Sequence, residues 1–224
     1  ELKGEVLFDG ASRGRYSTDA SIYQVEPIGV VVPRSEQDIV RAIQIAADEK
    51  IPILPRGGGT SQCGQTVGEA LVLDVSKHFA GVIALDVENR RVTVQPGLVL
   101  DQLNAYLKPH GLYFPVDVST SSRATIGGMT GNNSCGARSI RYGRMVENVR
   151  AIDALLADGS KLHFGQLPQD FQAADIPARF REIALAGFDE AFRAGVLGQQ
   201  ESYAKGEAQA IIEAFLASRG AGKS

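Results

Sequence analysis

The most informative chemical signal in the sequence is a set of glycines that follows an apolar run. Ten of the 25 glycines lie in two windows, residues 57–68 and 127–143. The first window opens with Gly57-Gly58-Gly59-Thr60-Ser61, directly after Arg56. Because glycine permits positive φ and a close backbone approach, successive N–H groups here can point inward and form a nest for an anion. A diphosphate suits such a nest, and a flexible surface turn is the alternative interpretation.

A second segment, residues 119–136, carries many side chains that can both donate and accept hydrogen bonds. Its hydroxyls and carboxamides lie among glycines that expose the backbone. This mixture suits the edge of a flavin ring, which presents one N–H donor beside several oxygen and nitrogen acceptors. A turn-rich, capped loop explains the same composition equally well, so both interpretations stay open.

The apolar pattern predicts a strand, a helix and a strand ahead of the first window. Residues 30–32 form a short buried strand, and residues 35–49 form a helix with Ser35 as its N-cap. Residues 51–54 form the second strand, which ends in a turn at 55–59. A crossover helix between two strands implies parallel pairing within one sheet.

The rest of the chain predicts further strands and helices around the second segment. Strands are expected at 71–75, 82–87 and 92–95, a helix at 100–107, and a hairpin formed by 151–157 and 161–164 around Asp158-Gly159. The long polar stretch between the helix and the hairpin is either disordered or functional. Residues 176–219 show helical spacing only.

Two other nucleotide-binding motifs fit poorly. Gln62 stands where the dinucleotide fingerprint that begins at Gly57 requires glycine. The C-terminal Gly222-Lys223-Ser224 resembles a relaxed phosphate-binding P-loop, but the pattern before it is helical and no helix can follow. A nucleotide hydrolase that uses Lys223 is therefore a weak alternative.

Composition limits the class of protein. The chain has 224 residues, 44% of them hydrophobic, with a net charge of −3. We expect no nucleic-acid partner because no basic stripe is present, and no membrane span because no apolar run approaches about 20 residues. The two cysteines, Cys63 and Cys135, are too few for a disulfide framework, and we expect them to be small buried thiols. The three histidines, His78, His110 and His163, lack metal-ligand spacing, so we expect no metal. The expected location is the cytoplasm, with peripheral attachment at the inner membrane left open.

Five motifs in register resemble the FAD domain of the vanillyl-alcohol oxidase family. They are Pro55-Arg56-Gly57-Gly58-Gly59-Thr60-Ser61, Leu73-Asp74-Val75-Ser76, Val94-Gln95-Pro96-Gly97, Ala124-Thr125-Ile126-Gly127-Gly128 and Tyr142-Gly143. Tyr16-Ser17-Thr18-Asp19-Ala20-Ser21 and the block from Gly131 to Ser139 resemble the bacterial D-2-hydroxy-acid dehydrogenases, the D-lactate, glycolate and D-2-hydroxyglutarate enzymes, and among these the long form with an iron–sulfur C-terminal region.

The resemblance implies a fold and a set of cofactor contacts. The fold is α+β: two small α/β lobes of a PCMH-type FAD-binding domain over residues 1–165, incomplete at its C-terminal end, then a helical extension over 166–224 that leads toward the substrate or cap region. The implied pyrophosphate loop comprises Pro55, Arg56, Gly57, Gly58, Gly59, Thr60 and Ser61, helped by Gly64 and Gln65. The implied flavin and ribityl wall comprises Asp117, Ser119, Thr120, Ser122, Thr125, Gly127, Gly128, Asn132, Asn133, Ser134, Gly136 and Tyr142.

The same resemblance implies an activity for the parent protein. That protein would oxidise a small D-2-hydroxy acid by hydride transfer to flavin N5, with catalytic residues, electron acceptor and any iron–sulfur centres outside this chain. FAD would be held non-covalently because the first loop has Gly59 and no histidine. The closing glycine segment and the cap domain are missing, so we expect the isolated chain to bind FAD weakly or not at all and to be inactive. Alternatives are a sugar-alcohol oxidase or UDP-sugar reductase of similar fold, or a non-catalytic module for another phosphorylated ligand.

Overall fold

The structure is a computed structural model that describes residues 2–165, all of which belong to one compact unit. The helices expected within 176–219 and the motif ending at Ser224 lie outside the described residues.

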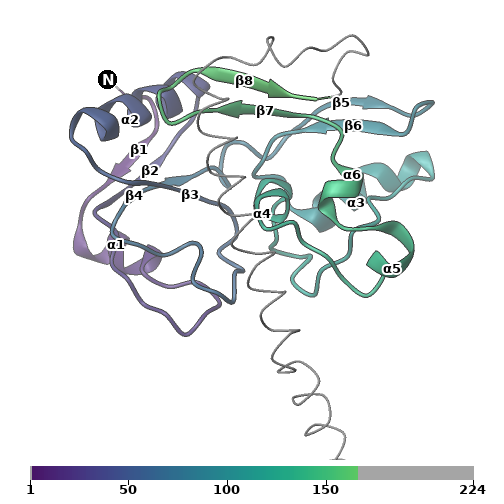
Figure 1. Cartoon of the computed structure of the whole chain (residues 1–224), viewed down its shortest axis with the longest axis horizontal. Helices are drawn as coiled ribbons and strands as arrows, with labels where there is room; N and C mark the ends of the chain where they lie inside the picture. Colours follow the sequence, from purple (N-terminus) through teal and green to yellow (C-terminus); the bar gives the residue numbers. More distant parts are fainter. Residues whose placement is uncertain (1, 166–224) are drawn as a thin grey trace, which may run out of the picture. The chain divides into compact units, whose positions relative to one another are not determined.

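A four-stranded sheet holds the first half of the domain (Figure 1). Its order is β1-β2-β4-β3, with bounds Glu5–Leu7, Gly29–Val32, Leu71–Asp74 and Ile53–Arg56. Both β2 and β3 run parallel to β4, which lies between them, and β1 pairs antiparallel with β2. Strands β2 and β3 are therefore parallel within one sheet as predicted, but each pairs with β4 and not with the other. Strand β3 runs two residues further than expected and forms an edge of the sheet.

Side chains of the central strands alternate between two apolar cores, as the two-residue period of a strand requires. On one face the sheet packs against α2 (Glu36–Asp48), in a core made of Val31, Leu71, Leu73, Ala42, Ile43 and Ala46. On the other face Val30, Val32 and Val72 pack with Tyr16, the last residue of α1 (Gly10–Tyr16). Ser35 caps α2 as predicted, in a capping box with Asp38.

The second half of the domain has its own core. Strands β5 (Val82–Asp86) and β6 (Arg91–Val94) form an antiparallel pair. They pack with α3 (Leu100–Leu107), whose leucines line the core as the helical spacing predicts. The short elements η1 (Lys108–His110), α4 (Ile126–Gly131), α5 (Ser139–Tyr142) and α6 (Met145–Asn148) complete this half.

A second hairpin lies beside the first half of the domain. Strands β7 (Ile152–Leu155) and β8 (Lys161–Phe164) pair antiparallel around the predicted turn, where Gly159 has a φ of +79°. Leu155 packs against the α2 core, and Lys161 forms an ion pair with Glu36 at the start of α2. The hairpin therefore lies alongside α2 (Figure 1).

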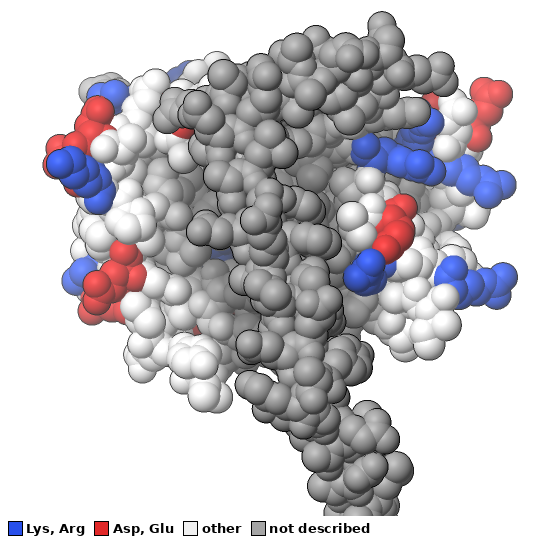
Figure 2. All heavy atoms as spheres, in the orientation of Figure 1, with Lys and Arg blue, Asp and Glu red and all other residues white. Residues whose placement is uncertain are grey.

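The structure confirms a mixed helix and strand fold with separate apolar cores. The expected C-terminal helical extension lies outside the described residues. On the described surface visible in Figure 2, basic and acidic side chains are both present. Within residues 2–165 no helix has the length and apolar character needed to cross a bilayer.

Candidate functional site

The first glycine window begins where β3 ends. Pro55 and Arg56 pair with β4 and belong to the strand rather than to the expected turn, so the loop starts at Gly57. The backbone N–H groups of residues 57–61 donate no hydrogen bond within the described part of the chain. Gly59 has a φ of +64°, which L side chains rarely adopt. The loop therefore offers a consecutive run of amide donors, as the nest interpretation predicts.

This loop lies directly against the polar segment 119–136. A Cβ on Gly57 would overlap the hydroxyl of Thr125, and a Cβ on Gly58 would overlap the carbonyl oxygen of Arg123. Further along, Gln65 Nε2 donates to Asn132 Oδ1 over 3.2 Å. The structure thus brings the first loop and the polar segment 119–136 into direct contact. Glycine at 57 and 58 permits this approach.

The polar segment 119–136 is bound to the connection between β6 and α3. Thr125 forms a bridge with Val99, is 2% exposed, and accepts a hydrogen bond from Gly128 N as the N-cap of α4. Gly127 N donates to Pro96 O over 2.8 Å, and a Cβ on Gly127 would overlap Pro96. These contacts fix the start of α4 next to the first loop.

The asparagine-rich residues after α4 order one another and the following helix. Asn133 has a φ of +46°, and its Oδ1 accepts a hydrogen bond from Val146 N over 3.0 Å. Asn132 Nδ2 donates to Ser134 Oγ over 3.2 Å. Asn132 is thus shared between its own turn and Gln65 of the first loop. Among the predicted site residues of this segment, Asn133 therefore has a structural role, because its side-chain oxygen accepts a hydrogen bond from the backbone of α6.

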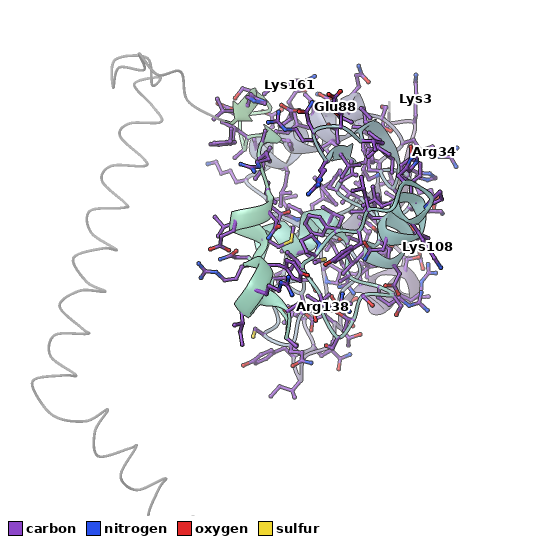
Figure 3. All side chains as sticks on the ribbon, turned by 90° about the vertical axis from the view of Figure 1, so that its right-hand side faces the viewer. Lys3, Arg34, Glu88, Lys108, Arg138 and Lys161 are labelled. Carbon is purple, nitrogen blue, oxygen red and sulfur yellow. The ribbon has the colours of Figure 1, made fainter. Side chains whose placement is uncertain are left out.

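Asp117 supports the same segment from the other side. A Cβ on Gly136 would overlap the Asp117 carbonyl oxygen, and Asp117 Oδ1 accepts a hydrogen bond from Arg138 N over 3.0 Å. Figure 3 shows Arg138 and Lys161 toward opposite ends of the view, so this segment lies away from the β8 end of the hairpin. Asp117 therefore orders the loop before α5.

Ser119, Thr120 and Ser122 lie in a turn at the start of the polar segment 119–136. The Thr120 carbonyl accepts hydrogen bonds from Arg123 N and Ala124 N, both over 2.8 Å. The three hydroxyls make no hydrogen bond within residues 2–165, so they can contact a ligand. Tyr142 lies at the end of α5, with its ring edge-on to Tyr113 at a centroid distance of 6.1 Å.

A hollow adjoins the second window. Its volume is about 440 Å³, and its lining is mostly apolar, with Met145, Val149, Ile152 and Phe164 beside Asn133. A flat ring with one polar edge suits such a lining, because apolar side chains cover its faces while a few polar groups orient it.

Asp19 belongs to the motif at residues 16–21, but the sequence predicts no individual role for it. Its Oδ2 accepts a hydrogen bond from Thr66 Oγ1 over 2.9 Å, and its Oδ1 accepts one from Ser21 N over 2.8 Å. Burial raises the pKa of Asp19, but the hydrogen bonds from Ser21 and Thr66 outweigh it and leave the pKa below its usual value. Its carboxylate joins the end of the first loop to the segment after α1.

The thiols do not match expectation. Cys63 and Cys135 are both exposed, so the prediction of two buried thiols is wrong. Each lies in an open polar loop rather than in an apolar core, which explains the exposure. Among residues 2–165 no group of three or more histidine, cysteine and acidic side chains is placed to hold a metal ion.

Together these features define a class of site. Consecutive unpaired amides, glycines at points of backbone contact and unpaired hydroxyls fit an anionic group such as a diphosphate. Beside an apolar hollow, this arrangement is typical of a domain that binds a nucleotide cofactor.

The comparisons with known proteins identify the family. Residues 27–165 match the family of FAD binding domains, and the chain belongs to that family, for which FAD is the cofactor.

Its relatives are dehydrogenases and an oxidase subunit by name. The chain is 39% identical over 189 residues to the D-2-hydroxyglutarate dehydrogenase of Pseudomonas putida, covering 81% of this chain and 19% of that protein. It is 40% identical over 168 residues to the Escherichia coli protein of the same name, covering 74% and 16%. Glycolate oxidase subunit GlcD of Bacillus subtilis is 36% identical over 186 residues, covering 80% and 39%. The chain thus spans less than a fifth of the length of the two D-2-hydroxyglutarate dehydrogenases.

Solved structures share the fold. The chain superposes on 6-hydroxy-D-nicotine oxidase of Arthrobacter nicotinovorans with a TM-score of 0.65 and 18% identity, covering 74% of this chain and 36% of the oxidase. An alkyldihydroxyacetonephosphate synthase gives a TM-score of 0.64 at 19% identity, with 76% and 33% covered. The chain therefore shares its mixed helix and strand fold with an oxidase and a synthase that are distant in sequence.

Proposed function

We propose that the loop 57–61 binds the pyrophosphate of FAD, with the turn 119–122 and the window 125–136 lining the flavin and ribityl part. The observation that carries this proposal is the run of five consecutive amides without a partner in the described residues, placed against Thr125. Amide donors and a nearby hydroxyl can bind phosphate oxygens without a large change in conformation. The hollow at Ile152 and Phe164, both of them partly exposed, offers an apolar surface for a ring of the cofactor.

We further infer that the cofactor is held without a covalent bond. The first loop contains Gly59 and no histidine through which the cofactor could be attached. Acid precipitation of the loaded protein should release all of the yellow colour into the supernatant. Colour retained in the pellet would contradict this inference.

The proposed activity of the parent protein is oxidation of a D-2-hydroxy acid. The names of the relatives support this substrate class, and they support it above a sugar-alcohol or UDP-sugar enzyme of similar fold. When bound, FAD supplies the hydride acceptor for such an oxidation. The residues of this chain bind and orient the cofactor, and the groups that bind substrate lie elsewhere in the parent protein.

Two ligands test the binding proposal. We would titrate FAD and riboflavin, each up to about 1 mM, into the 224-residue chain and follow flavin fluorescence and thermal melting. Because residues 2–165 already bring both windows together, we expect weak, saturable binding of FAD and a raised melting temperature. Riboflavin, which lacks the diphosphate, should bind far less tightly. Equal binding of both ligands, or no binding of FAD, contradicts the proposal.

A second experiment tests the substrate class. The parent protein, loaded with FAD and kept without oxygen, should lose its oxidised flavin absorbance on addition of D-2-hydroxyglutarate, D-lactate or glycolate. Reduction by a sugar alcohol and by none of these acids would favour the alternative oxidase.

A further inference from the structure

Arg56 directly precedes the free amides of the first loop, yet its guanidinium is bound to other groups. Nη1 donates to the carbonyl oxygens of Tyr16 and Thr66, both over 3.0 Å, and Nη2 donates to the carbonyl oxygen of Thr18 over 2.7 Å. The guanidinium also lies over the Tyr16 ring at 5.3 Å from the centroid. Its donors are therefore directed at backbone of the protein.

These contacts join the two ends of the loop to the segment after α1. Arg56 is the residue before the loop, and Thr66 lies at the end of the same loop. A Cβ on Gly59 would come within 2.8 Å of Arg56 Nη2, so the loop also lies directly against the guanidinium. In addition, Ala20 N donates to Gly59 O over 3.1 Å. The loop conformation is thus set from outside the loop.

The groups around Arg56 are themselves hydrogen-bonded and partly buried. Tyr16 OH donates to Asp74 Oδ2 over 2.7 Å, and Asp74 is 8% exposed. Burial lowers the pKa of the Arg56 guanidinium, and the nearby carboxylates of Asp19 and Asp74 act in the opposite direction. The charge of Arg56 is thus compensated by carboxylates of the protein.

We propose that Arg56 is a positioning residue, which holds the loop 57–66 open for a diphosphate through three backbone carbonyls rather than by contacting phosphate with its charge. This inference rests on the proposed FAD-binding function. The loop amides of residues 57–61 are unpaired within the described chain, so they cannot hold the loop open themselves. A planar fork that donates in several fixed directions can do so, and a compact ammonium cannot reproduce it.

The test compares Arg56→Lys and Arg56→Gln with Arg41→Gln, which removes an exposed arginine of α2 that makes no hydrogen bond or ion pair within the described residues. Hydrogen exchange of residues 57–66 is measured without FAD, and FAD affinity is measured at several salt concentrations. In both Arg56 variants the hydrogen-bonded amides of this loop, those of Cys63, Gln65 and Thr66, should exchange about tenfold faster. Both variants should bind FAD about tenfold more weakly. The salt dependence of binding should stay as in the wild type, because no phosphate-contacting charge is lost. Arg41→Gln should change none of these.

Two results would overturn the inference. One is unchanged loop exchange in Arg56→Gln. The other is wild-type affinity in Arg56→Lys with a shallower salt dependence in Arg56→Gln, which would mean that the charge itself contacts phosphate. A wild-type chain that binds no FAD would refute the proposed function, and the exchange measurement would still decide the role of Arg56.

Discussion

Replacing Gly58 with alanine tests the contact between the two glycine-rich windows. The new Cβ would overlap the carbonyl oxygen of Arg123 and come within 3.0 Å of the carbonyl carbon. A backbone group cannot rotate aside as a side chain can, so the loop 57–61 must move relative to the second window. Gly68→Ala is the matched control, because its Cβ would meet only Leu54 Cδ2, at an ordinary 3.7 Å.

The expected loss of FAD affinity follows from the amide donors of the loop that move. A hydrogen bond to a charged acceptor contributes about 1.5–3 kcal/mol. Losing one amide–phosphate contact in Gly58→Ala should therefore weaken FAD binding by about 10- to 150-fold. Fluorescence titration gives the affinity, and circular dichroism shows whether the variant is folded. A folded Gly58→Ala chain with wild-type affinity, or an equal loss in Gly68→Ala, would refute the reasoning.

Three further predictions concern stability. Thr125→Ala removes the cap of α4 and should lower the free energy of unfolding by about 1 kcal/mol, seen as a lower melting temperature; no change would contradict this. Burial raises the pKa of Asp38, but hydrogen bonds from backbone amides outweigh burial and leave this pKa below its usual value. The ionised Asp38 therefore stabilises the folded state above the unfolded-state pKa, and this contribution is lost as pH falls. Asp38→Asn should therefore make the melting temperature less sensitive to acid, and an unchanged acid limb would contradict this. Burial and the hydrogen bond to Asp74 raise the pKa of Tyr16. The contribution of Tyr16 to the free energy of unfolding is therefore lost as pH rises above about 10. Tyr16→Phe should remove this alkaline loss from a plot of melting temperature against pH.

Much of the sheet could be predicted from the sequence because its strands are continuous apolar runs. Residues 30–32 and 71–74 are buried on both faces, and a parallel strand of that kind leaves a clear signal in the sequence. The helix α1 leaves no such signal in the sequence, because apolar residues do not recur at helical spacing within Gly10–Tyr16. It is held by Asp9 as N-cap and by the packing of Tyr16, which only the tertiary structure supplies.

The site was predictable in its parts and less so in its internal contacts. The two windows stand out by their glycines, and the structure confirms that they meet. The helix α4 was not expected, since glycine has low helix propensity and three of its six residues are glycine. The role of Arg56 was not predictable either, because its acceptors are backbone carbonyls, which every residue type carries.

Hydrogen exchange with and without FAD is the most direct test of the central claim. If the amides that follow β3 bind the pyrophosphate, saturating FAD should slow exchange at residues 57–61, with weaker protection at 119–128. The β7–β8 turn at 156–160 should exchange at the same rate in both samples. Protection confined to other parts of the chain, with residues 57–61 unchanged at saturation, would contradict the account.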